Sequence, residues 1–130
     1  RAANFHPDLV ILGFGMNDRC GMEEYRNKTG RLMEAIRKVS PKTEFLLIAS
    51  TLPNELAATE PHHFWAHQDE YSESLKGLEG MGVAIADIQA VQKEIGKRKR
   101  YIDITGNWLN HPNDYLARIL AQVVIKTLGM

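Results

Sequence analysis

The chain has 130 residues, a formal net charge of +0 and 44% hydrophobic residues. These values fit a single globular domain, residues 1–130, with a core of its own. The neutral balance argues against nucleic acid or an anionic membrane as the main partner, because both attract an excess of lysine and arginine. No apolar run approaches the length of a membrane span. Cys20 is the only cysteine, which excludes an internal disulfide.

The sequence opens on Arg1, and an apolar run follows within ten residues. We expect that upstream sequence, including any signal peptide, is missing. The compartment is therefore left open, and secretion or export to a periplasm stays compatible with the chain.

Apolar runs alternate with amphipathic segments along the chain. Three runs have the length and composition of strands: residues 9–14, 45–49 and 83–88. The first is expected to be buried on both faces, and the second is also expected to be a buried strand. Four segments have apolar residues at helical spacing: 22–39, 65–78, a short segment carrying Val91 and Ile95, and 113–128. Asn17 or Asp18 is expected to cap the first of these helices.

This alternation predicts a parallel sheet with right-handed crossovers and helices on both faces. Sites in such sheets form outside the carboxyl ends of the strands. Three strands make a narrow sheet, and the first strand would leave an apolar edge unpaired. We therefore expect either missing strands or self-association through this edge.

Two polar loops are expected to meet at that end of the sheet. Gly13-Phe14-Gly15-Met16-Asn17-Asp18 leaves the first strand, and His111-Pro112-Asn113-Asp114 leads into the last helix. Loops held by a rigid scaffold often carry catalytic groups. The pattern predicts that Asn17 and His111 face one small space.

These two motifs, in this order, resemble the third and fifth sequence blocks of the SGNH, or GDSL-type, hydrolases. The resemblance implies a three-layer, flavodoxin-like α/β fold, with this chain as its C-terminal part. It implies that Asn17 contributes to an oxyanion hole and that His111 is the general base. An amide donor aimed at an oxyanion is worth roughly 3–4 kcal/mol. Imidazole can take and return a proton near neutral pH.

The chain departs from the family pattern at the nucleophile. The Gly-Asp-Ser motif that carries the family's serine is absent from this sequence. Ser50, at the end of a predicted strand, and Cys20 are weak substitutes, because Ser50 lacks a glycine-flanked elbow and Cys20 has no assigned histidine. We expect that the nucleophile lies outside this chain and that the 130 residues alone are inactive.

A second departure concerns the acid that orients the histidine. The family usually places aspartate three residues before the histidine, where this chain has Trp108. We therefore predict a Ser–His dyad, with Asp103 as the outside candidate for a third member.

The resemblance implies hydrolysis of carboxylic esters without a cofactor, with acetyl groups on carbohydrates as one expected substrate class. Phe64, Trp65 and Trp108 are the candidate residues for binding the acyl group or the sugar. The alternative is a non-catalytic binding module on the same fold. In that case His111 would have only a structural role in its loop.

Two other patterns have plainer explanations. His63 and His67 stand four residues apart, with Asp69 or Glu70 nearby, so a metal site is the minor alternative there. No wider metal motif supports it. The basic run 97–100 is interpreted as a solvated helix C-terminus, because no aromatic face for nucleic acid accompanies it.

Overall fold

The computed structural model describes residues 2–56 and 67–130. Within these ranges, a parallel sheet is formed by β1 (Leu9–Gly13), β2 (Glu44–Ile48) and β3 (Val83–Ala86), in the order β1-β2-β3. The helices are α1 (Met22–Val39), α2 (Tyr71–Lys76), α3 (Ile88–Gly96) and α4 (Asp114–Thr127). Short 3-10 turns are η1 (Ala2–Phe5), η2 (Gln68–Glu70) and η3 (Tyr101–Asp103). The predicted parallel α/β architecture is confirmed.

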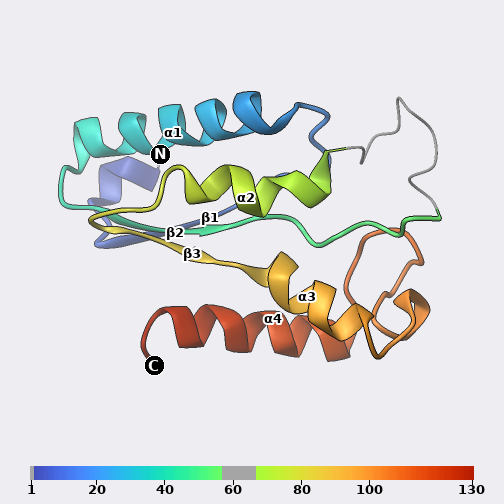
Figure 1. Ribbon diagram of the computed structural model, residues 1–130. Helices are drawn as coiled ribbons and strands as arrows, with labels where there is room; N and C mark the ends of the chain where they lie inside the picture. The colour runs from blue at the N-terminus through green and yellow to red at the C-terminus, as the bar shows by residue number, and fades with distance from the viewer. Residues whose placement is uncertain (1, 57–66) are drawn as a thin grey trace.

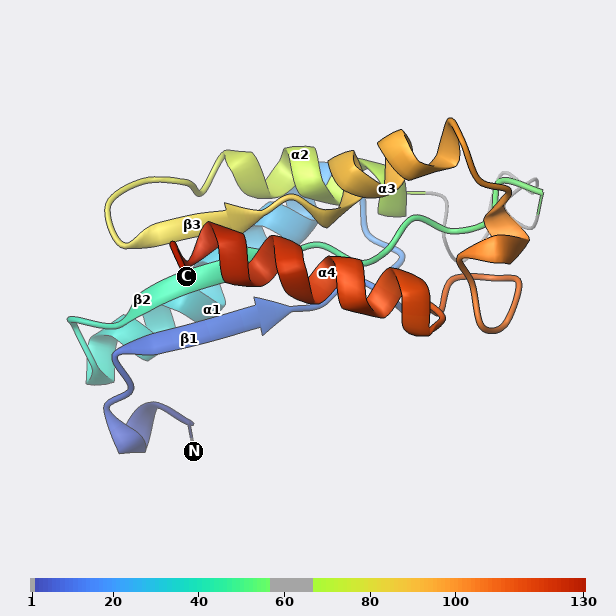
Figure 2. The ribbon, with the colours of Figure 1, turned by 90° about the horizontal axis from the view of Figure 1, so that it is seen from below.

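The helices cover both faces of the sheet. Figure 1 shows α1 and α2 on one face and α4 on the other, with α3 leaving the carboxyl end of β3. Figure 2, seen from below, shows that α4 crosses in front of the strands and runs back toward their amino ends. The sheet is therefore the middle layer of three.

The main core lies between the sheet and the α1–α2 layer. Phe45 and Leu47 of β2 are almost fully buried there, together with Met33 of α1 and Leu75 of α2. Burying an apolar side chain of this size stabilises the fold by roughly 1.5–3 kcal/mol. Leu46 points to the other face and is also fully buried. Strand β2 is therefore buried on both faces, as its apolar sequence predicts.

Strand β1 differs from the prediction. Only Leu12 is buried, whereas Leu9 is 39% and Ile11 is 50% exposed. In the described part of the chain β1 pairs with β2 alone, and α4 packs over β3 rather than over β1. The expectation of burial on both faces was wrong for this strand, because its apolar sequence does not reveal which neighbours are present.

The buried faces of α3 and α4 are narrower in apolar residues than their sequences indicate. In α3 the buried residues are Ile88, Gln89 and Gln92, whereas Val91 and Ile95, the apolar residues noted in the sequence, are only half-buried. The polar side of α3 faces inward because Gln89 and Gln92 form hydrogen bonds with the backbone of Ser50 and Leu52 in the segment after β2.

For the last helix the sequence pattern predicts an inward set of apolar residues: Leu116, Ile119, Leu120, Val123, Val124 and Leu128. Of this set, only Leu116 is fully buried in α4. Leu128 is exposed, since a narrow sheet cannot cover the whole length of this helix.

Helix bounds agree with the sequence pattern in two places. The predicted segment 22–39 is α1 itself, although Met22, Leu32 and Val39 are exposed on it. The predicted helix 113–128 matches α4 to one residue at each end. The predicted helix 65–78 is shorter in its described part, where η2 leads into α2. None of the described residues forms a helix long and apolar enough to cross a membrane.

Candidate active site at the carboxyl ends of the strands

Three loops gather at the carboxyl end of the sheet. They follow β1, follow β2 and precede α4, and both views place them at the same end of the molecule (Figures 1 and 2). Asn17 lies on the first loop and His111 on the third. Both residues are exposed, so their side chains are open to a ligand.

A pair of stacked tyrosines supports the loop that carries Asn17. The rings of Tyr25 and Tyr71 lie 3.9 Å apart, with planes 11° from parallel. The Tyr25 hydroxyl donates to the Phe14 carbonyl at 3.0 Å, and the Tyr71 hydroxyl donates to the Cys20 carbonyl at 2.8 Å. Burial raises the pKa of both phenols, so they stay protonated donors near neutral pH. These two bonds fix the ends of the loop on either side of Asn17.

Gly15 lets the loop turn closely over this stack. Its φ of 109° is a left-handed conformation that favours glycine, and a Cβ there would lie 2.8 Å from Cδ2 of Tyr71. The Asp18 amide then donates to the Gly15 carbonyl at 3.3 Å. The predicted helix cap was wrong, because α1 begins after Gly21 and has no side-chain cap.

The loop that carries His111 is built around the side chain of Asn107. Its Oδ1 accepts hydrogen bonds from the amides of Leu109, Asn110 and His111, at 2.9 to 3.0 Å. The His111 carbonyl accepts from the Thr105 hydroxyl and the Gly106 amide, each at 2.9 Å. The backbone of His111 is therefore held on both its N–H and its C=O side.

The segment after β2 is hydrogen-bonded to the loop that carries His111. The Thr51 hydroxyl donates to the Asn110 carbonyl at 2.6 Å, and the Asn54 side chain donates to the Trp108 carbonyl at 2.8 Å. The Tyr101 hydroxyl lies 2.9 Å from the carbonyls of both Leu52 and Leu109. The loop is therefore anchored to the end of the central strand.

Buried glutamines complete the link to the Asn17 loop. Gln68 donates through Nε2 to the carbonyls of Gly15, at 2.9 Å, and of Met16. Gln89 donates to the carbonyls of Gln68 and Ser50, the latter at 2.8 Å. Since Ser50 precedes the Thr51 anchor, a continuous chain of hydrogen bonds and backbone runs from the Asn17 loop to the His111 loop.

Sequence reasoning missed these glutamines. The sequence pattern of this segment was described only through Val91 and Ile95, and the polar residues Gln89 and Gln92 were not considered for the interior. The available signal was their spacing of three residues, which places both on one helix face. A pair of amides on one face indicates that the helix binds backbone rather than packing on side chains.

The same arrangement of strands, helices and loops occurs in solved ester hydrolases. A structure described as a GDSL-like lipase from Parabacteroides merdae superposes with a TM-score of 0.80 at 20% identity, over 98% of this chain and 62% of that chain. An acetyl-xylooligosaccharide esterase from Geobacillus superposes with a TM-score of 0.76 at 19% identity, over 98% of this chain and 62% of that chain. A family 3 carbohydrate esterase from Talaromyces cellulolyticus superposes with a TM-score of 0.70 at 16% identity, over 98% of this chain and 59% of that chain. No protein-family model and no curated protein sequence matches the chain.

This chain has an SGNH/GDSL-type hydrolase fold. It spans about three fifths of the length of these structures. The likeness at this level of identity concerns the fold, so the roles of individual residues rest on their own surroundings.

The remaining predicted site residues are Asp103, Trp108, Phe64 and Trp65. Asp103 accepts from Arg100 through both carboxylate oxygens, at 3.0 to 3.3 Å, and Arg100 holds the pKa of this carboxyl below its usual range. None of the described hydrogen bonds joins it to His111, so its role as orienting acid stays a prediction without a supporting contact. Trp108, three residues before His111 in the sequence, is 63% exposed and has a φ of 64°. Phe64 and Trp65 lie outside the described residues.

The weak substitutes for a nucleophile are both buried in the SGNH-type core. Ser50 is buried, and its hydroxyl has no hydrogen-bond partner among the described residues. The Cys20 sulfur is buried 3.9 Å from the Tyr71 hydroxyl. A buried hydroxyl or thiol without a histidine partner is poorly placed to attack a substrate.

The alternative metal site has no counterpart in the described part of the chain, where His, Cys, Asp and Glu form no group of three. His63 lies outside that part. His67 Nδ1 lies 3.4 Å from the Glu70 carboxylate, which gives this histidine a local partner.

Proposed function

We propose that this chain supplies part of the active site of a carboxylic ester hydrolase. In this proposal Asn17 donates to the oxyanion, His111 acts as general base, and a serine from outside the 130 residues is the nucleophile. The proposed substrates are esters of small acids, with acetylated carbohydrates as the leading class. The named activities of the structural neighbours support that class, as acetyl-xylooligosaccharide and carbohydrate esterases.

The observation that carries the proposal is the linkage between the two loops. Gln68 and Gln89 connect the backbone beside Asn17 to Ser50, and Thr51 connects the same strand end to the backbone beside His111. Such a linkage fixes the position of two distant loops relative to each other. An amide and an imidazole that must act on one ester carbonyl need this kind of fixed arrangement.

The proposed chemistry follows from the groups present. His111 would accept the proton of the attacking hydroxyl and return it to the leaving alcohol. The Asn17 amide would stabilise negative charge that develops on the carbonyl oxygen. Trp108, which is exposed on the same loop as His111, would offer a flat apolar surface for a sugar or an acyl group. The proposed mechanism uses a Ser–His dyad, in keeping with the described residues, among which no carboxylate contacts His111.

Binding of a neutral ester tests the shared site on this chain directly. We expect acetylated xylotriose to shift NMR amide signals in both loops, residues 14–18 and 106–112, and deacetylated xylotriose to shift them much less. Asn17→Ala and His111→Ala should each weaken this difference, whereas Asn27→Ala, an exposed asparagine of α1, should not. Shifts confined to one loop would contradict the shared site. Equal binding of both sugars would favour a non-catalytic binding module.

Turnover of p-nitrophenyl acetate tests where the nucleophile lies. For the 130-residue chain we expect the same background rate as for its His111→Ala variant. A rate well above background that depends on His111 would place a nucleophile within the chain. Ser50→Ala and Cys20→Ala would then identify it.

A further inference from the structure

Strand β1 leaves one edge of the sheet open. In the described part of the chain it pairs with β2 alone, and Figure 2 shows it as the outermost strand, which α4 does not cover. The Glu44 amide donates to the Asp8 carbonyl at 2.8 Å, so this carbonyl points toward β2. Backbone groups point to alternate sides along a strand. The N–H and C=O groups of Leu9, Ile11 and Gly13 therefore point away from β2, into the open side.

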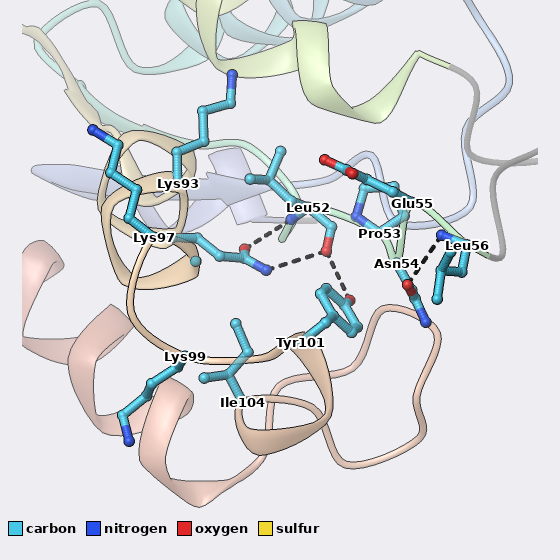
Figure 3. A pocket seen from close by; sticks show the side chains of 12 residues that line it. Leu52, Pro53, Asn54, Glu55, Leu56, Lys93, Lys97, Lys99, Tyr101 and Ile104 are labelled. Carbon is cyan, nitrogen blue, oxygen red and sulfur yellow. Dashed lines mark hydrogen bonds between the residues drawn. The ribbon is translucent and has the colours of Figure 1, made fainter.

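These outward groups have no partner among the described residues, where no hydrogen bond engages them. The segment after β2 differs, because side chains satisfy its backbone. Gln92 bonds both the N–H and the C=O of Leu52, and Tyr101 also donates to that carbonyl (Figure 3). The open edge of β1 is therefore a set of backbone donors and acceptors that another strand can bind.

The open edge is also apolar and lacks the usual protection against pairing. Its sequence, LVILG, contains neither a charged residue nor a proline. Leu9 and Ile11 are exposed on the face opposite to that of Leu12, which belongs to the core. In β3, the other outer strand, no residue is exposed. Of the two outer strands, β1 is therefore the one suited to strand addition.

We propose that two copies of this chain bind each other through these edges, with their β1 strands antiparallel and a two-fold axis at Ile11. In this register Ile11 lies opposite Ile11 of the partner subunit, and Leu9 lies opposite the partner's Gly13. Each outward N–H and C=O group of the three residues then has a partner. The edge is complementary to itself, which favours a second copy over an unrelated strand.

Other registers pair fewer of these groups. Moving the axis by one residue toward the amino end places Gly13 opposite Pro7, which has no N–H. Moving it by one residue toward the carboxyl end places Leu9 opposite Gly15, where φ is 109° and the strand has ended. The register centred on Ile11 is therefore the one that uses the whole strand.

The side chains agree with this register. Two-fold pairing keeps the same face of both copies together, so the two Ile11 side chains lie side by side, with Cα atoms about 5.5 Å apart. Leu9 meets the partner's Gly13, which has no side chain to obstruct it. Because the pairing uses the β1 edges of both copies, the assembly closes as a dimer and does not grow into a fibre.

Sedimentation equilibrium of the 130-residue chain tests the dimer. We expect a reversible monomer–dimer equilibrium at micromolar concentrations. Ile11→Lys should weaken the dimer by about tenfold or more, because two like charges would lie directly opposite each other. Met81→Lys, at an exposed apolar position just before β3, is the matched control and should leave the equilibrium unchanged. Circular dichroism checks that both variants are folded.

Cross-linking tests the register. Ile11→Cys should form a disulfide-linked dimer on air oxidation, because Cα atoms about 5.5 Å apart suit a disulfide. Leu9→Cys is the matched control and should not cross-link, since the two copies of this residue would lie about 13 Å apart along the strands. The unmodified chain is a second control, because its only cysteine, Cys20, is buried.

Three results would overturn the proposal: a monomer at every concentration, a dimer that Ile11→Lys leaves intact, or a cross-link through Leu9→Cys in place of Ile11→Cys. A monomer would assign the edge to a segment outside the 130 residues. The dimer does not depend on the proposed ester hydrolase, and His111→Ala should leave it unchanged. A failure of the dimer is thereby distinguished from a failure of the proposed ester site.

Discussion

Replacing Gln89 with leucine should strongly destabilise the fold. The side chain is almost fully buried and makes three bonds to backbone: its Nε2 donates to Ser50 at 2.8 Å and to Gln68, and its Oε1 accepts from the amide of Ser72 at 3.1 Å. Leucine keeps a similar volume and removes all three bonds. Three buried backbone groups would then lack partners.

The size of the effect follows from these bonds. A buried polar group left without a partner costs about 1–3 kcal/mol. Three such groups set an upper range near 9 kcal/mol, and local rearrangement with entry of water reduces it. We expect a loss of about 3–5 kcal/mol in the free energy of unfolding. The free energy of unfolding of a small domain is typically about 5–15 kcal/mol, so the variant would lose a large part of its stability.

Urea denaturation followed by circular dichroism measures this loss. Gln122→Leu, at an exposed position of α4, is the matched control and should change stability by no more than about 0.5 kcal/mol. A loss below about 1 kcal/mol for Gln89→Leu would refute the view that this glutamine holds the loops together. Gln89→Glu should be destabilising near neutral pH and recover partly in acid, where a protonated carboxyl can donate again.

Three further changes test other parts of the site. Gly15→Ala should lower the free energy of unfolding by about 2–4 kcal/mol, because φ is positive there and Tyr71 is too close for a Cβ. Gly80→Ala, at a position with open space for a Cβ, is the control in the same urea assay. Asn113→Ala removes the side-chain cap of α4 and should lower the melting temperature, at a cost of about 1–2 kcal/mol. Burial raises the pKa of Tyr101 to about 12, above the value of about 10 that a tyrosine has in the unfolded chain. The protonated hydroxyl therefore stabilises the fold fully below pH of about 10, and this contribution is lost as the pH rises through about 12. Alkaline unfolding should therefore shift in Tyr101→Phe, and an unchanged curve would contradict this assignment.

The sequence predicted the elements well where one physical signal dominates. Helix α1 has apolar residues at helical spacing, and its bounds agree with the prediction at both ends. The β2 run from Phe45 has apolar residues on both faces and matches a fully buried central strand. Both signals are local, so a single sequence contains them.

The sequence predicted less where burial depends on distant partners. Ile11 has the same chemistry as the residues of β2, yet it lies on an edge strand and is half exposed. Gln89 is polar and nevertheless buried, because two of its bonding partners, Ser72 of α2 and Ser50 after β2, lie 17 and 39 residues away in the sequence. For Asp103, proximity in sequence to His111 suggested a partner, but Arg100 is closer and carries the opposite charge.

The backbone of Trp108 has a consequence for engineering this loop. A bulky residue in a left-handed conformation adds an energetic cost of order 1 kcal/mol, which glycine would not have. Trp108→Gly should therefore relax the turn while deleting the large indole surface. In the proposed function Trp108 binds the substrate, so stability and substrate binding favour different residues at this position. A screen for thermal stability alone would select the glycine variant, which has lost the proposed aromatic binding surface.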